Sequence, residues 1–172
     1  ADQKNITDIV IGLHIKQKDN ESVYGFIFNS LLQSVSQSIY IYHHSQALNT
    51  VKRILVAVPS KAEKETGFLA WYERIRQLSI QLGAKVIFYA SKDTIQLLQI
   101  LTKQKQRDIV GVKFMELNDW EDFLIIAKNI ASNDMLAVVQ ARRSTVSYHP
   151  LFEEMPVLLE KFFADKSFLV VY

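Results

Sequence analysis

The sequence predicts an α/β fold of the doubly wound type, with a mainly parallel sheet covered by helices on both faces to give three layers. Short apolar runs rich in Val, Ile, Phe and Tyr recur along the chain and do not alternate with polar residues, which is typical of strands buried on both faces. The segments between these runs have apolar residues at the spacing of a helix. From residue 53 onward strand and helix alternate, and the right-handed crossover rule turns that order into a parallel sheet.

Each expected strand coincides with one apolar run. The expected strands are Asp8–Leu13, Ser38–Tyr42, Arg53–Val58, Lys85–Tyr89, Ile109–Met115, Met135–Val139 and Phe168–Tyr172.

The clearest expected helix spans Thr66–Leu82, where apolar residues recur at three- and four-residue spacing. Ser60–Glu63 resembles a capping box upstream of this helix, and Gly83 is a stop signal. A second helix is expected over Asp93–Lys103. A third is expected over Trp120–Ala131, capped by Asn118 or Asp119.

The last expected helix begins at Pro156, because proline fits the first turn of a helix but not its interior. We expect this helix to bury Leu158, Leu159, Phe162 and Phe163. The preceding segment, Arg142–Met155, is then a long loop.

The start of the chain resembles its end. A strand, a polar loop, a helix over Ser22–Gln37 and a second strand in the first 44 residues match the series that begins at Asn133 and ends at Tyr172. Such a repeat indicates tandem copies of one fold. We therefore expect residues 1–47 to be the C-terminal β-α-β remnant of a preceding copy and residues 48–172 to be a complete copy.

Composition excludes several classes of function. The 20 Lys and Arg against 18 Asp and Glu leave a charge of +2 without a basic stripe, so nucleic acid is not an expected partner. The absence of Cys excludes disulfides and Cys-ligated zinc. No apolar run approaches the roughly 20 residues that span a bilayer, and the first residues lack the apolar core of a signal peptide. We expect a soluble fragment of a longer polypeptide.

Several segments resemble known families. Arg53–Val58, a long helix, Gly83–Phe88 and a Leu-Ala-Val-Val strand before a long loop resemble the universal stress protein domain. Asp8–His14, Ala57–Glu63 and Ser144–His149, with Leu48–Arg53 and Phe88–Ser91, resemble the C-terminal region of bacterial monovalent cation:proton antiporters. The resemblance implies a Rossmann-like sandwich of the adenine nucleotide alpha hydrolase type, at the cytoplasmic face of the inner membrane.

ATP-binding members of the universal stress family carry an acidic residue after the first strand and a glycine-rich loop after the fourth. Here Pro59-Ser60 stands at the first position, and no glycine follows Gly111. Backbone approach to a triphosphate needs small residues, so the ATP motif is degenerate. Glu153 and Glu154 also place negative charge before the last helix. We expect weak ATP binding or none, and no cofactor.

One loop remains a candidate site for a different anion. Arg142 and Arg143, with Ser144, Ser147 and His149, could receive a cyclic dinucleotide or a lipid headgroup. The alternative is a solvated loop without a ligand.

No catalytic machinery is visible in the sequence, so an enzyme is not expected. No Ser has the surroundings of a nucleophile elbow, and no phosphate-cradling Gly-Lys-Ser loop is present. His43-His44 is better explained as a surface turn than as a metal site, because adjacent residues of an extended chain point in opposite directions.

The function expected from these features is that of a regulatory or interaction domain. In an antiporter the membrane segments carry the ion and the proton, so a soluble tail acts by biasing conformations or recruiting partners. The expected partner is the membrane-embedded part of the same polypeptide, with a homodimer as a further possibility. A stand-alone, nucleotide-binding universal stress protein is the alternative. Universal-stress-like domains commonly pair through their last strands, so the resemblance also implies that the final strands of the two copies, Ser38–Tyr42 and Ser167–Tyr172, meet antiparallel in one continuous sheet.

Overall fold

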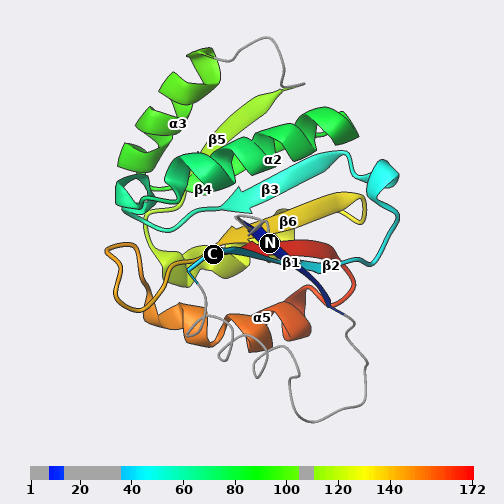
Figure 1. Ribbon diagram of the computed structural model, residues 1–172. Coiled ribbons are helices and arrows are strands. Elements are labelled where there is room, and N and C mark those ends of the chain that lie inside the picture. The colour runs from blue at the N-terminus through cyan, green and yellow to red at the C-terminus, as the bar shows by residue number, and fades with distance from the viewer. Residues whose placement is uncertain (1–7, 14–35, 105–110) are drawn as a thin grey trace, which may run out of the picture.

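The computed structural model describes residues 8–13, 36–104 and 111–172, and it contains one seven-stranded sheet (Figure 1). The strand order is β1-β2-β7-β6-β3-β4-β5, and every neighbouring pair is parallel except β2 and β7. The predicted doubly wound α/β class is confirmed. The strands are β1 (Asp8–Leu13), β2 (Ser38–His43), β3 (Arg53–Ala57), β4 (Lys85–Ala90), β5 (Val112–Glu116), β6 (Asp134–Val139) and β7 (Ser167–Val171).

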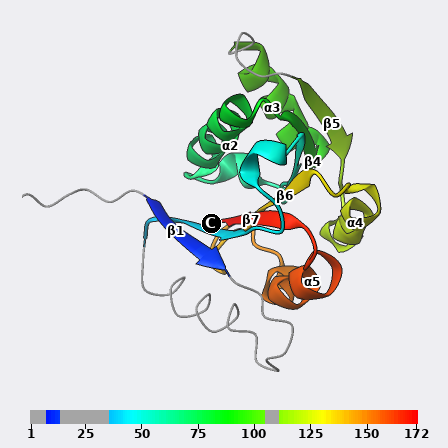
Figure 2. The ribbon, with the colours of Figure 1, turned by 90° about the vertical axis from the view of Figure 1, so that its right-hand side faces the viewer.

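Helices cover both faces of the sheet (Figure 2). One face carries α2 (Phe68–Leu82) and α3 (Lys92–Gln104), whose apolar residues share a core with Ile54, Val56 and Phe88 of the sheet. The opposite face carries η3 (Trp120–Leu124), α4 (Ile125–Asn129) and α5 (Met155–Phe162), which share a second core with Leu55 and Leu136. Short 3₁₀ turns, η1 (Leu48–Thr50), η2 (Ala62–Lys64) and η4 (Pro150–Glu153), connect these elements.

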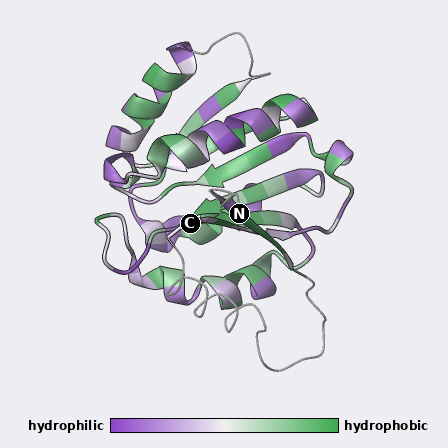
Figure 3. Cartoon of the chain, in the orientation of Figure 1, coloured by the Kyte–Doolittle hydropathy of each residue, from purple (hydrophilic) through white to green (hydrophobic). Residues whose placement is uncertain are grey.

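Beyond their charged first residues, Arg53 and Asp134, the central strands β3 and β6 are apolar, as Figure 3 shows. Every residue of β6 is buried, and Ile54 to Ala57 of β3 have no exposed surface. A strand can be apolar at every position only if both of its faces are covered. The non-alternating runs therefore predict the three layers correctly.

Helix α2 ends as predicted but does not begin as predicted. Gly83 adopts a left-handed conformation, with φ of 62°, and its amide donates to the carbonyls of Ile80 and Ser79. The predicted capping box at Ser60–Glu63 is wrong. Lys61 is itself left-handed, with φ of 67°, and η2 separates the segment from α2, whose N-cap is Gly67. Glu63 instead accepts a hydrogen bond of 2.7 Å from Thr94 Oγ1.

The helix predicted over Trp120–Ala131 is shorter and irregular. The side chain of Asp119 caps it, accepting from the amide of Glu121 at 2.9 Å. The first turns are 3₁₀ and only Ile125–Asn129 is α-helical. This irregular winding buries Trp120, Phe123 and Ile126, and it leaves the predicted core residues Leu124, Ala127 and Ile130 partly exposed.

Two predictions near the end of the chain need correction. The loop over Arg142–Met155 contains η4, and α5 begins at Met155 with Pro156 in its first turn. Phe162 is 40% exposed, because α5 turns Met155 and Leu159 inward and the chain leaves the helix to bury Phe163. Lys161 lies over the exposed Phe162 ring at 5.2 Å.

The predicted helix over Ser22–Gln37 lies outside the described residues as far as residue 35, and so do residues 109 and 110 of the strand predicted over Ile109–Met115. The described part of that strand, β5, ends one residue later than predicted, at Glu116.

The last strands of the two predicted copies pair antiparallel, as expected. Tyr40, Ile41, Tyr42 and His43 of β2 lie opposite Val171, Val170, Leu169 and Phe168 of β7. Ile39 and Tyr172 extend the ladder by exchanging amide-to-carbonyl hydrogen bonds of 3.1 and 2.9 Å. Residues more than 120 positions apart are thereby joined into one sheet.

Side chains reinforce this junction on several sides. Arg74 of α2 forms an ion pair of 2.6 Å with Asp8 of β1. Ser167 Oγ accepts from the amide of Ser45 at 3.0 Å. The ring nitrogens of His43 lie 3.2 Å from the carbonyl oxygens of Leu13 and Ala164. His43 is 7% exposed, so the predicted surface turn is wrong for His43 and holds for the exposed His44.

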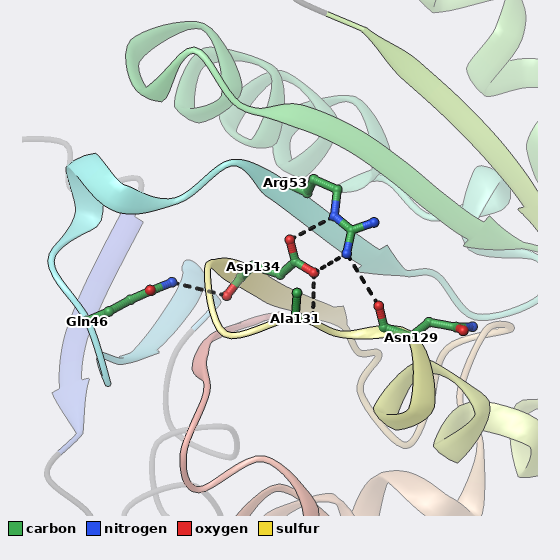
Figure 4. A network of polar contacts seen from close by, with 5 residues as sticks. All are labelled: Gln46, Arg53, Asn129, Ala131 and Asp134. Carbon is green, nitrogen blue, oxygen red and sulfur yellow. Dashed lines mark hydrogen bonds and ion pairs between the residues drawn. The ribbon is translucent and has the colours of Figure 1, made fainter.

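An ion pair fixes β3 beside β6 at the amino ends of these strands (Figure 4). Asp134, with no exposed surface, receives Arg53 Nε at 2.8 Å and Arg53 Nη2 at 2.5 Å, and its carboxylate also accepts from the amide of Ala131 at 2.7 Å. Arg53 further reaches the carbonyl of Asn129, and Gln46 donates to the carbonyl of Asp134. The bond with Asp134 raises the pKa of Arg53. This network is structural, because its polar groups are directed at one another.

We predict that Arg53→Ala lowers the free energy of unfolding by about 2–3 kcal/mol, because it leaves the buried Asp134 carboxylate without its cation. Urea unfolding measures the change. Arg143→Ala is the matched control, since it breaks the exposed pair of Arg143 and Glu153 and should cost less than about 1 kcal/mol. Equal effects of the two substitutions would show that the Arg53 pair does not hold β3 and β6 together.

Candidate functional site

A cleft of about 170 Å³ opens beside the carboxyl ends of β6 and β7, and the segment that follows β3 lines it as well. From β3 the chain proceeds to β4 and β5 on one side, and it returns to β6 and β7 on the other. The strand order therefore reverses between β3 and β6, and crevices at such reversals are the usual ligand sites of α/β sheets. The segment after β3 and the loop after β6 form two of the walls.

The segment after β3 carries Glu65 into the cleft. The left-handed Lys61 and the turn η2 redirect the chain after Pro59, and Glu65 follows in an extended conformation. The Glu65 carbonyl accepts the amide of Phe68 at 3.1 Å, which fixes the residue just before α2. The side chain of Glu65 points toward the loop after β6.

The loop after β6 binds the Glu65 carboxylate. Ser147 donates to Glu65 Oε1 from its amide at 2.9 Å and from its hydroxyl at 2.7 Å. A turn at Arg142, closed by the amide and hydroxyl of Thr145 at 3.0 and 2.9 Å, shapes the loop for these bonds. In phosphate-binding loops, successive backbone amides are the groups that hold the anion. Here they hold a carboxylate of the chain itself.

The electrostatics of this contact favour an ionised Glu65. Burial is the largest single cause and raises the pKa of the Glu65 carboxyl. The hydrogen bonds from Ser147, Thr145 and Val146 together lower this pKa by more than burial raises it. The pKa of Glu65 is left below its usual value of 4.5. Near neutral pH the loop therefore already surrounds a negative charge.

Two of the five predicted site residues line the cleft, Arg142 and Ser147. Arg142 is half-buried and donates from Nη2 to the carbonyl of Gln37 at 3.0 Å, so it ties the loop to the segment before β2. Ser147 is 4% exposed and is committed to Glu65.

The other three predicted site residues do not line the cleft. Arg143 pairs with Glu153 at 2.9 Å and is mostly exposed, and Ser144 is exposed as well. His149 accepts the amide of Leu151 at 3.2 Å and so caps η4. The five residues predicted as one anion site are therefore divided between a cleft wall, the surface and a helix cap.

Gln140 is a cleft residue that the sequence analysis did not single out. It follows β6 directly, is 4% exposed, and accepts a hydrogen bond from the Tyr172 hydroxyl through Oε1. Its Nε2 has no hydrogen-bond partner within the described part of the chain. A buried amide donor in a cleft wall is a polar group that a ligand could satisfy.

Glu65 was also missed, because a single carboxylate between Lys64 and Thr66 belongs to no motif. The position of Glu65 after an expected strand could have pointed to it. Residues after neighbouring parallel strands meet at one edge of the sheet, so a carboxylate after β3 and free amides after β6 become neighbours.

The sequence matches no protein-family model and no curated protein. Within residues 8–13, 36–104 and 111–172, no helix is long and apolar enough to cross a bilayer, and no group of three or more His, Asp and Glu side chains is placed to hold a metal ion.

We predict that Glu65→Gln lowers the free energy of unfolding by about 1–2 kcal/mol near neutral pH, because it removes the charge from two charge-assisted hydrogen bonds. The folded-state pKa of Glu65 is lowered, so its contribution is present above pH 4.5 and is lost as the pH falls through that lowered value. Denaturant unfolding of wild type and variant across this range measures the difference. Glu154→Gln, an exposed carboxylate in the same region, should leave stability within about 0.5 kcal/mol at every pH. A Glu65→Gln effect that does not change with pH would contradict the assignment.

Proposed function

We propose that this chain is a non-catalytic regulatory or interaction domain of a bacterial monovalent cation:proton antiporter, located at the cytoplasmic face of the inner membrane. The antiporter assignment is supported by the resemblance of Ala57–Glu63 and Ser144–His149, among other segments, to the C-terminal region of those transporters. The domain acts on exchange through contacts with the membrane-embedded part of its own polypeptide.

One observation favours a domain that works through protein contacts over a domain that binds a nucleotide. The loop that would hold a phosphate is occupied by Glu65, through the amide and hydroxyl of Ser147. A triphosphate would have to displace this carboxylate and would meet its charge. The cleft volume of about 170 Å³ is also well below the roughly 300–1,000 Å³ of typical small-molecule sites. In this proposal the loop after β6, where a phosphate would bind, is closed to nucleotides by the carboxylate of Glu65.

A second candidate function is that of a small-ligand sensor, which is related to the alternative of a nucleotide-binding universal stress protein. The unpartnered Nε2 of the buried Gln140 favours it, because this group offers a hydrogen bond inside the cleft. The observed positions of Arg143, Ser144 and His149 argue against a cyclic dinucleotide or a lipid headgroup on the loop as a whole.

Thermal-shift measurements separate these candidates, because a ligand that binds only the folded state must raise its melting temperature. At about 5 mM ligand, a Kd of about 10 μM would add about 3.7 kcal/mol and raise the melting temperature by roughly 7–15 °C. We predict a rise below about 2 °C for ATP, AMP, NAD and cyclic di-AMP, because a Kd of 5 mM or weaker adds at most about 0.4 kcal/mol.

Glu65→Ala supplies the matched variant for this screen. Removing the built-in carboxylate frees the Ser147 amide and hydroxyl, so we predict that inorganic phosphate stabilises Glu65→Ala measurably more than it stabilises wild type or Glu154→Ala. A wild-type chain that binds ATP tightly would contradict the closed site and would favour the nucleotide-sensing alternative.

The regulatory role itself is tested in the transporter. We predict that cation/proton exchange, measured in everted membrane vesicles, persists when residues 48–172 are deleted but changes in its pH or cation dependence, since the domain biases transport without carrying the ion. Exchange with unchanged dependence in the truncated transporter would contradict a regulatory role.

A further inference from the structure

Strand β1 forms one edge of the sheet, far from β5 at the opposite edge (Figure 2). It pairs with β2 on one side, and no strand of the described residues pairs with its other side. Val10, at the middle of β1, is 73% exposed. An apolar strand with an unpaired edge is a template for another strand, and folded proteins normally cover it.

The pairing of β2 with β7 shows which part of the fold β1 represents. Ile41 and Val170 are each the fourth residue of their strand, and they lie opposite each other in the antiparallel ladder. Both point to the core that contains α5, whereas Tyr40 and Leu169 point to the other face. The two strands are therefore related by a local two-fold axis perpendicular to the sheet. This axis also relates β1, which pairs parallel with β2, to β6, which pairs parallel with β7.

Strand β6 has two neighbours that β1 lacks in the described part of the chain. On its far edge β6 pairs in parallel with β3, and its residues Met135, Ala137 and Val139 lie under α2 in a shared core. When the two-fold rotation is applied, the position of β3 falls on the free edge of β1. The position of α2 falls on the sheet face beside that edge.

An apolar groove lies on that face. It has a volume of about 290 Å³, and Val10, Tyr40, Tyr42 and Leu169 of the sheet form its floor. Leu78 of α2 and the half-exposed Leu48 contribute to its sides. Burial raises the pKa of both tyrosine hydroxyls, with the Asp8 carboxylate adding to the effect at Tyr40. The groove and the free edge are adjacent, because Val10 belongs to both.

We propose that a strand and helix equivalent to β3 and α2, carried by the same polypeptide, complete this end of the sheet. The strand pairs parallel to β1, and the helix lies across the groove beside α2. The inference rests on the proposed function, which places the chain in a longer transporter that carries a preceding copy of the fold.

The two-fold relation favours this occupant over a second copy of the chain. Two copies joined through β1 would pair these strands antiparallel, whereas β6 receives a parallel strand at the equivalent edge. Pairing of β1 with β5 of another copy joins different surfaces and leaves a free strand at each end, so it produces open chains of molecules. A β3–α2 unit covers the edge and the groove together.

Thiol labelling at Val10 tests the proposal. The chain contains no Cys, so Val10→Cys introduces one reporter at an exposed position where substitution leaves the core intact. Maleimide modification is followed at the level of the peptide by mass spectrometry, in the 172-residue chain and in the full-length transporter. Ile100→Cys on α3, at a position 52% exposed, is the matched control.

We expect Val10→Cys to react at least about ten-fold more slowly in the transporter than in the isolated chain, with Ile100→Cys equally reactive in both. Equal rates at Val10→Cys would overturn the proposal. Protection in the isolated chain that disappears on dilution would also overturn it and assign the edge to a second copy. Cation/proton exchange is measured on the same preparations, so that the antiporter assignment and the completion of the sheet at β1 are tested separately. A full-length protein that shows no exchange but protects Val10→Cys would refute the antiporter assignment alone.

Discussion

The antiparallel pairing of β2 with β7 is the interaction on which the rest of the structure depends. It is the one antiparallel contact in the described sheet, and it joins a strand near the start of the chain to the last strand. The ladder turns β7 from an edge strand into a central one, and the side chains of Phe168–Val171 lie buried or nearly so in the two cores on either side of the sheet. The bonds of Ser45 and Gln46 to Ser167 and Asp134 then fix the connection between the two predicted copies.

The same pairing determines where function can reside. Tyr172 is held in the ladder by Ile39, and from there its hydroxyl reaches Gln140 in the cleft wall. Arg142 binds the carbonyl of Gln37 just before β2, so the loop after β6 is tied to the first segment. With Glu65 held by Ser147, the loop is braced from two sides. These contacts suit a rigid scaffold that presents surfaces better than they suit an open nucleotide site.

Most of the fold could be predicted from the sequence because it is encoded locally. Buried parallel strands need continuous apolar runs, Gly83 is needed for a left-handed helix end, and Asp119 carries the hydrogen-bond acceptor that an N-cap requires. The antiparallel pairing of β2 and β7 was expected from the resemblance to universal stress domains, which commonly pair through their last strands, together with the likeness between the start and the end of the chain. The strand register could not be predicted, because apolar residues at every position fit several alignments.

The features that the sequence did not reveal depend on partners distant along the chain. Ser60–Glu63 has the composition of a capping box, but Thr94 takes the Glu63 carboxylate. His43 is polar by composition and is buried because two backbone carbonyls and the Phe168 ring surround it. Ser147 was predicted to receive an external anion, and its actual partner, Glu65, stands 82 residues earlier. Arg143 likewise pairs with a carboxylate of the chain, that of Glu153, so these two predicted site residues meet internal anions.

Native-state hydrogen exchange tests the central claim, that the two predicted copies form one cooperative sheet. The amides of Ile39 and Tyr172 donate across the junction, and the amides of β3 report on the middle of the sheet. If the junction is integral, Ile39 and Tyr172 exchange with the same free energy as the β3 amides, because they open only when the whole structure unfolds. Rapid exchange at Ile39 and Tyr172 while β3 stays protected would show that the first segment is a loosely attached appendage, and would contradict the account.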